Sequence, residues 1–239
     1  MLSEELWYPR LQLASDCSLL VTFGDGISRK HHLDVFRLFT LLRSEASPAI
    51  RNIHPAYSSL LISFDPLVIS PTEFEASVRD LLDRIDSAVI LMARAVEIPV
   101  CYDAAFAPDL EFVATHNRIS VNEAIRYHCS AEYLVYFLGF SPGFPYLGEL
   151  PKPLVTPRLS TPRVKVPAGS VAIGGSQTGI YPVDSPGGWR IIGRTPARLF
   201  QPDGEPPTLL QMGDAVRFRP ITREEFDEML GKEQVGGRG

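Results

Sequence analysis

Hydrophobic and polar positions alternate between strand-like and helix-like patterns over the first part of the chain. Residues 17–25 are mostly apolar and end at a glycine turn, which predicts a strand. Residues 34–43 carry apolar side chains at helical spacing, which predicts a helix. Residues 50–66 then predict two strands that are divided at His54 and Pro55.

A second helix start follows at residues 70–73, where Ser70 is the expected N-cap and Glu73 stands at the third helical position. Apolar positions from Phe74 to Ile85 share one face of this helix. The order of strand, helix, two strands and helix predicts a small α+β sandwich domain over residues 1–92. In such a domain, one sheet is covered by two helices.

The pattern changes in the second part of the chain. Residues 95–103 predict a strand, and two short helices follow, the second starting at a capping box from Ser120 to Glu123. From Tyr133 onward, helical periodicity disappears and short apolar runs are separated by Gly and Pro. Many short strands with frequent turns are typical of a barrel or a sandwich, which we expect over residues 93–222.

The C-terminal residues, 223–239, are expected to form a terminal helix and a flexible tail. The helix pattern covers residues 222–230, where Thr222 is the expected N-cap. The following residues are rich in glycine and polar side chains, which favours disorder. The chain as a whole is therefore predicted to be α+β, with a small N-terminal domain and a strand-rich C-terminal domain.

Composition narrows the class of protein. The 239 residues are 45% hydrophobic and 21% charged, without a run of about 18 apolar residues that would predict a membrane span. The N-terminus is acidic and lacks the apolar segment of a signal peptide. Three separated cysteines are typical of reduced thiols in the cytoplasm, and a net charge of −5 argues against nucleic-acid binding.

Residues 137–200 differ from the rest of the chain. They hold 10 of the 18 Gly and 10 of the 21 Pro, and seven basic residues against two acidic ones. A basic segment full of turns within an acidic protein is a candidate site for an anion or a partner. Two tempting motifs in it are interpreted as turns. Residues 139–143 match GxSxG, but Pro142 lacks the backbone N–H that an oxyanion hole needs, and residues 174–179 lack the lysine of a phosphate loop.

Several side chains of this segment are candidate ligand contacts. Arg158, Arg163 and Lys165 are cations within eight residues of each other, and Arg163 and Lys165 point the same way on a strand whose Val164 faces the core. The alternative is a solvated strand face. The turn at residues 174–179 displays Gln177 and Thr178, and Tyr181 follows it. Trp189 could line an apolar slot or fill the barrel.

His128 is the candidate acid or base, because it closes a short helix just before the basic segment. The alternative is a histidine at the edge of the core. The remaining histidines are scattered without metal-ligand spacing, so no metal is assigned to this chain.

The motifs together resemble a family that contains the B subunit of bacterial 5-oxoprolinase, proteins named allophanate hydrolase subunit 1, and the KipI inhibitor of a sporulation histidine kinase. The likeness is dense over residues 95–220 and weak before them. The segments that carry it are the His128 helix end, residues 99–103, Asp109-Leu110, and residues 135–148, 156–158, 161–182, 185–196 and 213–218.

This resemblance implies that the second domain is a cyclophilin-like β-barrel. It also implies that the chain acts with two partners, the C and A subunits of 5-oxoprolinase, and is inactive alone. The complex opens the lactam of 5-oxoproline to L-glutamate at the expense of ATP with Mg²⁺. Arg158, Arg163, Lys165, Gln177 and Thr178 are then the side-chain types that such a site needs, and His128 is its candidate acid or base.

Two other functions stay open within the same resemblance. The chain could be a regulatory inhibitor of a sensor histidine kinase, or part of a biotin-dependent carboxyltransferase acting on urea or a similar amide. Fold alone does not decide among them.

Overall fold

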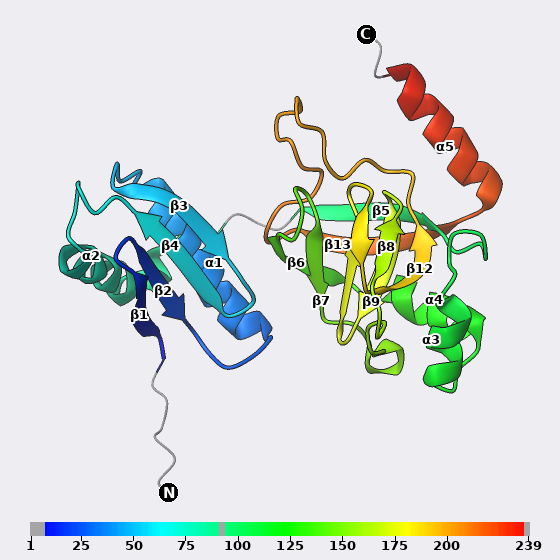
Figure 1. The fold of residues 1–239 in the computed structure, drawn as a ribbon, viewed down its shortest axis with the longest axis horizontal. Helices are drawn as coiled ribbons and strands as arrows, with labels where there is room; N and C mark the ends of the chain where they lie inside the picture. The colour runs from blue at the N-terminus through cyan, green and yellow to red at the C-terminus, as the bar shows by residue number, and fades with distance from the viewer. Residues whose placement is uncertain (1–7, 91–93, 237–239) are drawn as a thin grey trace, which may run out of the picture. The chain divides into compact units, whose positions relative to one another are not determined.

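The computed structural model describes residues 8–90 and 94–236, and the chain forms two compact units, residues 1–92 and 93–239 (Figure 1). Each unit has its own sheet and its own core. The units are therefore described one at a time.

In the first unit, four antiparallel strands within residues 8–90 form a sheet in the order β1-β2-β4-β3. Helices α1 and α2 supply apolar faces to its core, which includes Val35 and Leu38 from α1 and Phe74 and Val78 from α2. The elements are β1 (Arg10–Ser15), β2 (Ser18–Thr22), α1 (Arg29–Ser44), β3 (Ile50–Pro55), β4 (Ser59–Phe64), α2 (Pro71–Asp83) and the short 3₁₀ helix η1 (Ile85–Ser87).

The start of α2 follows the capping pattern of the sequence. The Ser70 hydroxyl accepts from the backbone N–H of Glu73, and the Glu73 carboxylate accepts from the backbone N–H of Ser70. Each bond satisfies a helix-terminal donor, so the boundary is set locally. By contrast, the sequence pattern does not predict β1, because most of its side chains are exposed and it lacks a strong alternation.

In the second unit, seven strands within residues 94–236 close a barrel in the order β10-β7-β6-β13-β5-β12-β9. Strands β13 and β5 are parallel, whereas the other neighbours are antiparallel. The barrel strands are β5 (Ala95–Cys101), β6 (Tyr133–Leu138), β7 (Pro145–Gly148), β9 (Ser170–Gly174), β10 (Gln177–Ile180), β12 (Arg190–Arg194) and β13 (Ala215–Ile221). The prediction of a mixed α+β chain with strands that close into a barrel is confirmed.

Further elements surround this barrel. Strands β8 and β11 form a separate two-stranded antiparallel ribbon, and helices α3 and α4 pack against each other and against barrel strands. These elements are α3 (Leu110–His116), α4 (Val121–Ser130), the 3₁₀ helix η2 (Lys152–Leu154), β8 (Arg163–Val166), β11 (Ser185–Gly187) and α5 (Arg223–Gly236). The capping box predicted for α4 is present between Ser120 and Glu123.

Helix α5 corrects one expectation. It extends to Gly236, six residues beyond the predicted end of the terminal helix at residue 230, while residues 237–239 lie outside the described chain. The Thr222 hydroxyl accepts from the Glu225 N–H at 3.2 Å, which begins the helix as expected. None of the described helices is long and apolar enough to cross a membrane.

Candidate functional site

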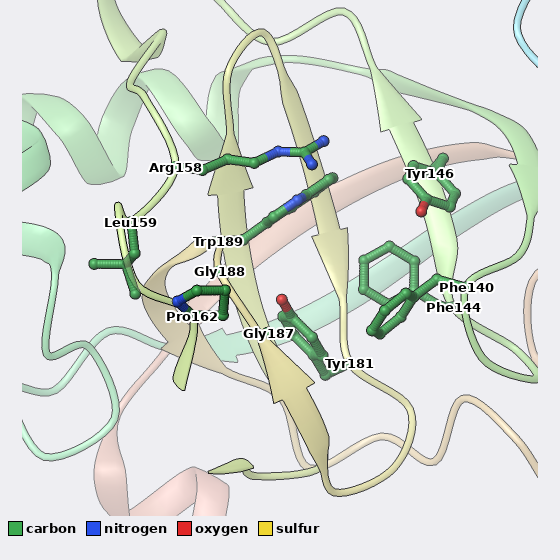
Figure 2. A pocket seen from close by; sticks show the side chains of 10 residues that line it. All are labelled: Phe140, Phe144, Tyr146, Arg158, Leu159, Pro162, Tyr181, Gly187, Gly188 and Trp189. Atoms are coloured by element: carbon green, nitrogen blue, oxygen red, sulfur yellow. The ribbon is translucent and has the colours of Figure 1, made fainter. Parts of the chain in front are cut away.

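A cavity of about 200 Å³ opens on the barrel unit, and half of the residues that line it are aromatic (Figure 2). The loop between β6 and β7 supplies part of it, and β7, the segment before β8, and β11 with the residues before and after it supply the rest. The lining residues are Phe140, Phe144, Tyr146, Arg158, Leu159, Pro162, Tyr181, Gly187, Gly188 and Trp189.

The aromatic rings of the cavity form one packed cluster. Phe144 makes edge contacts with Tyr181 and Trp189, at ring-centroid distances of 5.2 and 5.6 Å. Phe144, Tyr181 and Trp189 are all buried, whereas Phe140 is 62% exposed at the cavity mouth. Edge-to-face packing is a preferred arrangement of aromatic rings, so these side chains support one another in the cavity wall.

Glycines make this packing possible. A Cβ atom on Gly174 would lie 2.6 Å from the Trp189 ring, and one on Gly187 would overlap the Tyr181 hydroxyl oxygen. Neither position has room for a side chain. The glycine-rich composition of residues 137–200 is thus explained in part by rings that press against the backbone of neighbouring strands.

We expect Gly187→Ala to lower the free energy of unfolding of the barrel by about 1–3 kcal/mol, because the methyl group must displace the Tyr181 ring. Gly188→Ala is the matched control, since its Cβ would meet only ordinary contacts at 3.6 Å or more. Urea denaturation of both variants measures the difference. Equal stability of the two variants would contradict a wall in which Tyr181 presses on the Gly187 backbone.

Arg158 is the cation of the cavity. Its side chain is exposed and its guanidinium lies 5.4 Å from the centre of the Trp189 ring, an arrangement visible in Figure 2. Among the described residues, no carboxylate pairs with Arg158. A guanidinium that is stacked on an aromatic ring and lacks an acidic partner keeps its donors available to an anion.

Two phenols face the same space. Burial raises the pKa of Tyr146, and Arg158 offsets part of that rise. Burial also raises the pKa of Tyr181, with partial offsets from the Trp189 backbone N–H and from Arg158. Both hydroxyls are therefore neutral near pH 7 and can act as hydrogen-bond donors.

The other two predicted cations are used elsewhere. Arg163 Nη2 donates to Asp109 Oδ1 at 2.9 Å, and Lys165 pairs with Asp184 at 2.8 Å. The expectation that Val164 faces the core is wrong, since its side chain is 91% exposed. The physical reason is that β8 belongs to a two-stranded ribbon outside the barrel, so no second layer covers this position.

Asp109 is a buried anchor whose ion pairs the sequence pattern does not reveal. Its Oδ2 accepts from the Ile191 backbone N–H at 2.7 Å, and Arg190 Nη1 lies 3.8 Å from Oδ1. Together with Arg163, these contacts tie the start of α3 to β12 and to β8. The Asp109 carboxylate thus contacts Arg163 and Arg190, two of the seven basic residues in the segment 137–200.

His128 lies in the barrel core and not in the cavity. It is fully buried, its Nδ1 is 2.7 Å from the Tyr102 hydroxyl, and its Nε2 is 3.0 Å from Thr178 Oγ1. Thr178 Oγ1 donates to the Ala172 carbonyl, so it accepts from Nε2–H, and Nδ1 accepts from Tyr102. Burial lowers the pKa of His128 to about 3. These contacts match the alternative of a core histidine, since both ring nitrogens are occupied.

The remaining candidate ligand contacts, Gln177 and Thr178, do not line the cavity. Thr178 is buried beside His128, and Gln177 starts β10 at the hairpin after Gly175, whose φ is +66°. The stretch 174–179 is therefore a hairpin between β9 and β10, with no helix N-terminus for a phosphate. Of the predicted ligand contacts, the structure brings Arg158 and Tyr181 together in the cavity.

Comparison with known proteins connects this architecture to a family. The description "Carboxyltransferase domain, subdomain C and D" matches residues 9–210, which include every residue that lines the cavity. The chain belongs to this carboxyltransferase-domain family. The match covers parts of both units, so the resemblance is not confined to the barrel.

Named relatives of this carboxyltransferase-domain chain fall into two groups. It is 40% identical to the 5-oxoprolinase B subunit of Bacillus subtilis over 91% of this chain and 95% of that protein. It is 56% identical to the 5-oxoprolinase B subunit of Escherichia coli O157:H7 over 54% of this chain and 59% of that protein. Urea amidolyase of Saccharomyces cerevisiae is 26% identical over 90% of this chain but only 13% of that protein.

Solved structures also resemble this chain over most of its length. The crystal structure of TTHA0988 superposes with a TM-score of 0.75 at 37% identity, over 85% of this chain, which spans about two fifths (40%) of that one. A conserved uncharacterized protein of Pyrococcus horikoshii is 45% identical, with a TM-score of 0.55, over 91% of this chain and 100% of that protein. Both structures therefore share the fold over most of this chain.

Sequence reasoning missed part of the cavity of this carboxyltransferase-domain chain. Phe140 lies in the β6–β7 loop, and Tyr146 belongs to residues 143–148, whose apolar composition suits a partner contact equally well. Trp189 could serve as wall or core. Trp189 is both, since it is only 6% exposed and lines the cavity. The signal that could have found these residues is the run of aromatic side chains between glycines at 140–148.

The GFSPG stretch is a turn, as predicted. The Phe144 backbone N–H donates to the Ser141 carbonyl at 3.0 Å, and this turn connects β6 to β7. Within the described residues there is no group of three His, Cys, Asp or Glu side chains that could hold a metal ion.

Proposed function

We propose that this chain is the B subunit of an ATP-dependent 5-oxoprolinase, which opens 5-oxo-L-proline to L-glutamate in the cytoplasm. One observation carries the proposal, namely 40% identity to a 5-oxoprolinase B subunit over nearly the whole of both chains. The proposal includes two partners, the C and A subunits of 5-oxoprolinase, without which this chain is inactive. It also takes the barrel to be cyclophilin-like, with helices packed on a closed sheet.

The chemistry of the proposed reaction suits a shared site. A lactam is an unreactive amide, so its oxygen must be activated at the expense of ATP before water can attack the ring carbon. Such a site needs cations for the carboxylate and for phosphate, together with donors for the developing oxyanion. This chain offers Arg158 and two neutral phenols, but its residues 174–179 do not fit a phosphate loop. We therefore place ATP and its Mg²⁺ on the partners or at an interface with them.

The test is reconstitution with the C and A subunits. We expect glutamate release from 5-oxo-L-proline to require all three proteins and ATP, and to fall to background when this chain is omitted. The measurement is enzymatic detection of glutamate together with phosphate release. Unchanged glutamate release without this chain would refute the proposal.

A second candidate function is that of a component of a biotin-dependent carboxyltransferase that acts on urea. The observation that favours it is the likeness to urea amidolyase along 90% of this chain. Transfer of a carboxyl group from carboxybiotin to urea in the reconstituted complex would support this candidate, and the absence of such transfer would remove it. Inhibition of a sensor histidine kinase stays a prediction, tested by kinase autophosphorylation.

A further inference from the structure

We propose that the aromatic cavity binds a small, flat carboxylic acid, with Arg158 as the anchor of the carboxylate. The identity of that acid as 5-oxoproline rests on the proposed function, whereas the class of ligand rests on the cavity itself. The charges, the shape and the hydrogen-bond donors of the site support the same ligand class.

Internal ion pairs leave one cation at the cavity. Arg163 and Arg190 lie against Asp109, and Lys165 pairs with Asp184. Arg158 has no carboxylate partner among the described residues and lies at the cavity wall. The positive charge that the cavity presents therefore comes from one guanidinium, which suits a ligand with one carboxylate.

The rings give the cavity its shape. Trp189 lies beneath the Arg158 guanidinium and contacts the Tyr146 and Phe144 rings edge to face, while the exposed Phe140 ring stands at the mouth (Figure 2). A volume of about 200 Å³ is below the roughly 300–1,000 Å³ of cavities for drug-sized ligands. A volume of this size suits a single small ring, and a flat ring makes more contact with aromatic walls than a flexible chain does.

The hydrogen-bond donors of the cavity determine which polar groups a bound ligand ring can have. The hydroxyls of Tyr146 and Tyr181 are neutral, because burial raises both pKa values. Neutral phenols donate to an uncharged acceptor such as an amide oxygen. A five-membered lactam that bears a carboxylate offers all three features: a flat ring, one anionic end and one amide oxygen.

Intrinsic fluorescence gives a direct binding test. The sequence contains two tryptophans, so Trp7→Phe leaves Trp189 as the reporter in the cavity wall. In this background, 5-oxo-L-proline is expected to change Trp189 emission in a saturable way. Two probes separate the features of the ligand: 2-pyrrolidone lacks the carboxylate, and L-glutamate lacks the ring. Each is expected to bind at least tenfold more weakly than 5-oxo-L-proline.

Arg158→Gln is the decisive variant, because it removes the charge from an exposed side chain and leaves the core intact. We expect at least a tenfold loss of affinity for 5-oxo-L-proline and almost no change for 2-pyrrolidone. Arg126→Gln is the matched control, since Arg126 is exposed on α4 and does not line the cavity. Thermal melts of both variants establish that they are folded.

The reconstituted complex separates this inference from the proposed function. If the complex releases glutamate and Arg158→Gln raises the KM for 5-oxo-L-proline at least tenfold, both stand. If glutamate is released but Arg158→Gln leaves both the KM and the fluorescence titration unchanged, the cavity inference is overturned while the function stands. If Trp189 reports Arg158-dependent binding but no complex with this chain releases glutamate, the inference stands and the proposed function falls.

Discussion

Replacement of His128 by alanine is expected to lower the free energy of unfolding of the barrel unit by about 3–5 kcal/mol. The imidazole is fully buried, stacks on Phe218 at 4.3 Å between ring centres, and bridges Tyr102 to Thr178. Its removal creates a cavity and takes one hydrogen-bond partner from each of the Tyr102 and Thr178 hydroxyls, and these costs add. Guanidinium denaturation followed by Trp189 fluorescence in the Trp7→Phe background measures the change.

His128 also predicts how stability depends on pH. Its pKa is about 3 in the folded chain and about 6.5 when unfolded. Between these two pH values, His128 is protonated in the unfolded state and neutral in the folded state. The contribution of neutral His128 is complete above pH 6.5 and is lost as the pH falls toward 3. The loss approaches 1.4 kcal/mol per pH unit within that window. Between pH 6.5 and pH 4, the free energy of unfolding of the His128→Ala variant should therefore fall less steeply than that of the unsubstituted chain.

His116→Ala is the matched control, because His116 is exposed at the end of α3. We expect its free energy of unfolding to change by less than about 1 kcal/mol. A His128→Ala chain that is as stable as the control, with the same pH dependence as the unsubstituted chain, would contradict a core role. It would restore the sequence-based hypothesis that His128 exchanges a proton with substrate.

Asp109→Ala is expected to lower the free energy of unfolding of the barrel by about 3–5 kcal/mol. The carboxylate is buried and satisfies both the Arg163 guanidinium and the Ile191 backbone N–H. Removing one member of a buried ion pair costs more than the pair contributes, because the other charge stays in a poorly solvated place. Arg163 is only partly exposed, so water cannot fully replace Asp109.

Asp184→Ala provides the contrast, since Asp184 and Lys165 form an exposed ion pair. Pairs of that kind contribute at most about 1 kcal/mol, and we expect a change of that size or less. A double-mutant cycle with Asp109→Ala and Arg163→Ala should show that the two effects overlap strongly. Additive effects within about 0.5 kcal/mol would show that the two side chains do not act as a pair.

Local features of the sequence were enough to predict much of the fold. The helix starts at Ser70 and Ser120 depend on side chains three residues apart, so their capping bonds are visible in the local sequence. Strand segments such as 95–103 were visible because apolar side chains dominate them. The GFSPG turn was assigned correctly because a proline lacks an N–H in any context.

The candidate site was only partly predictable, for a reason that Arg158 and Arg163 illustrate. Both follow a proline in the same basic segment, and the sequence offers no difference between them as anion ligands. The fold places Asp109, which is 54 residues away from Arg163, within hydrogen-bonding distance of it, and leaves Arg158 beside Trp189. Pairing over such a separation depends on the tertiary fold, which brings the start of α3 beside β8, and cannot be read from a local pattern.

The sequence by itself determined the order of most helices and strands, β1 excepted, the basic and glycine-rich character of residues 137–200, and the family to which they point. The tertiary structure alone decided which polar side chains are enclosed. It placed His128 in the core and exposed Val164, because burial depends on which layers cover a position and not on residue type. It also brought Phe140, Tyr146 and Trp189 to the cavity that Arg158 lines, since folding places segments far apart in the chain side by side.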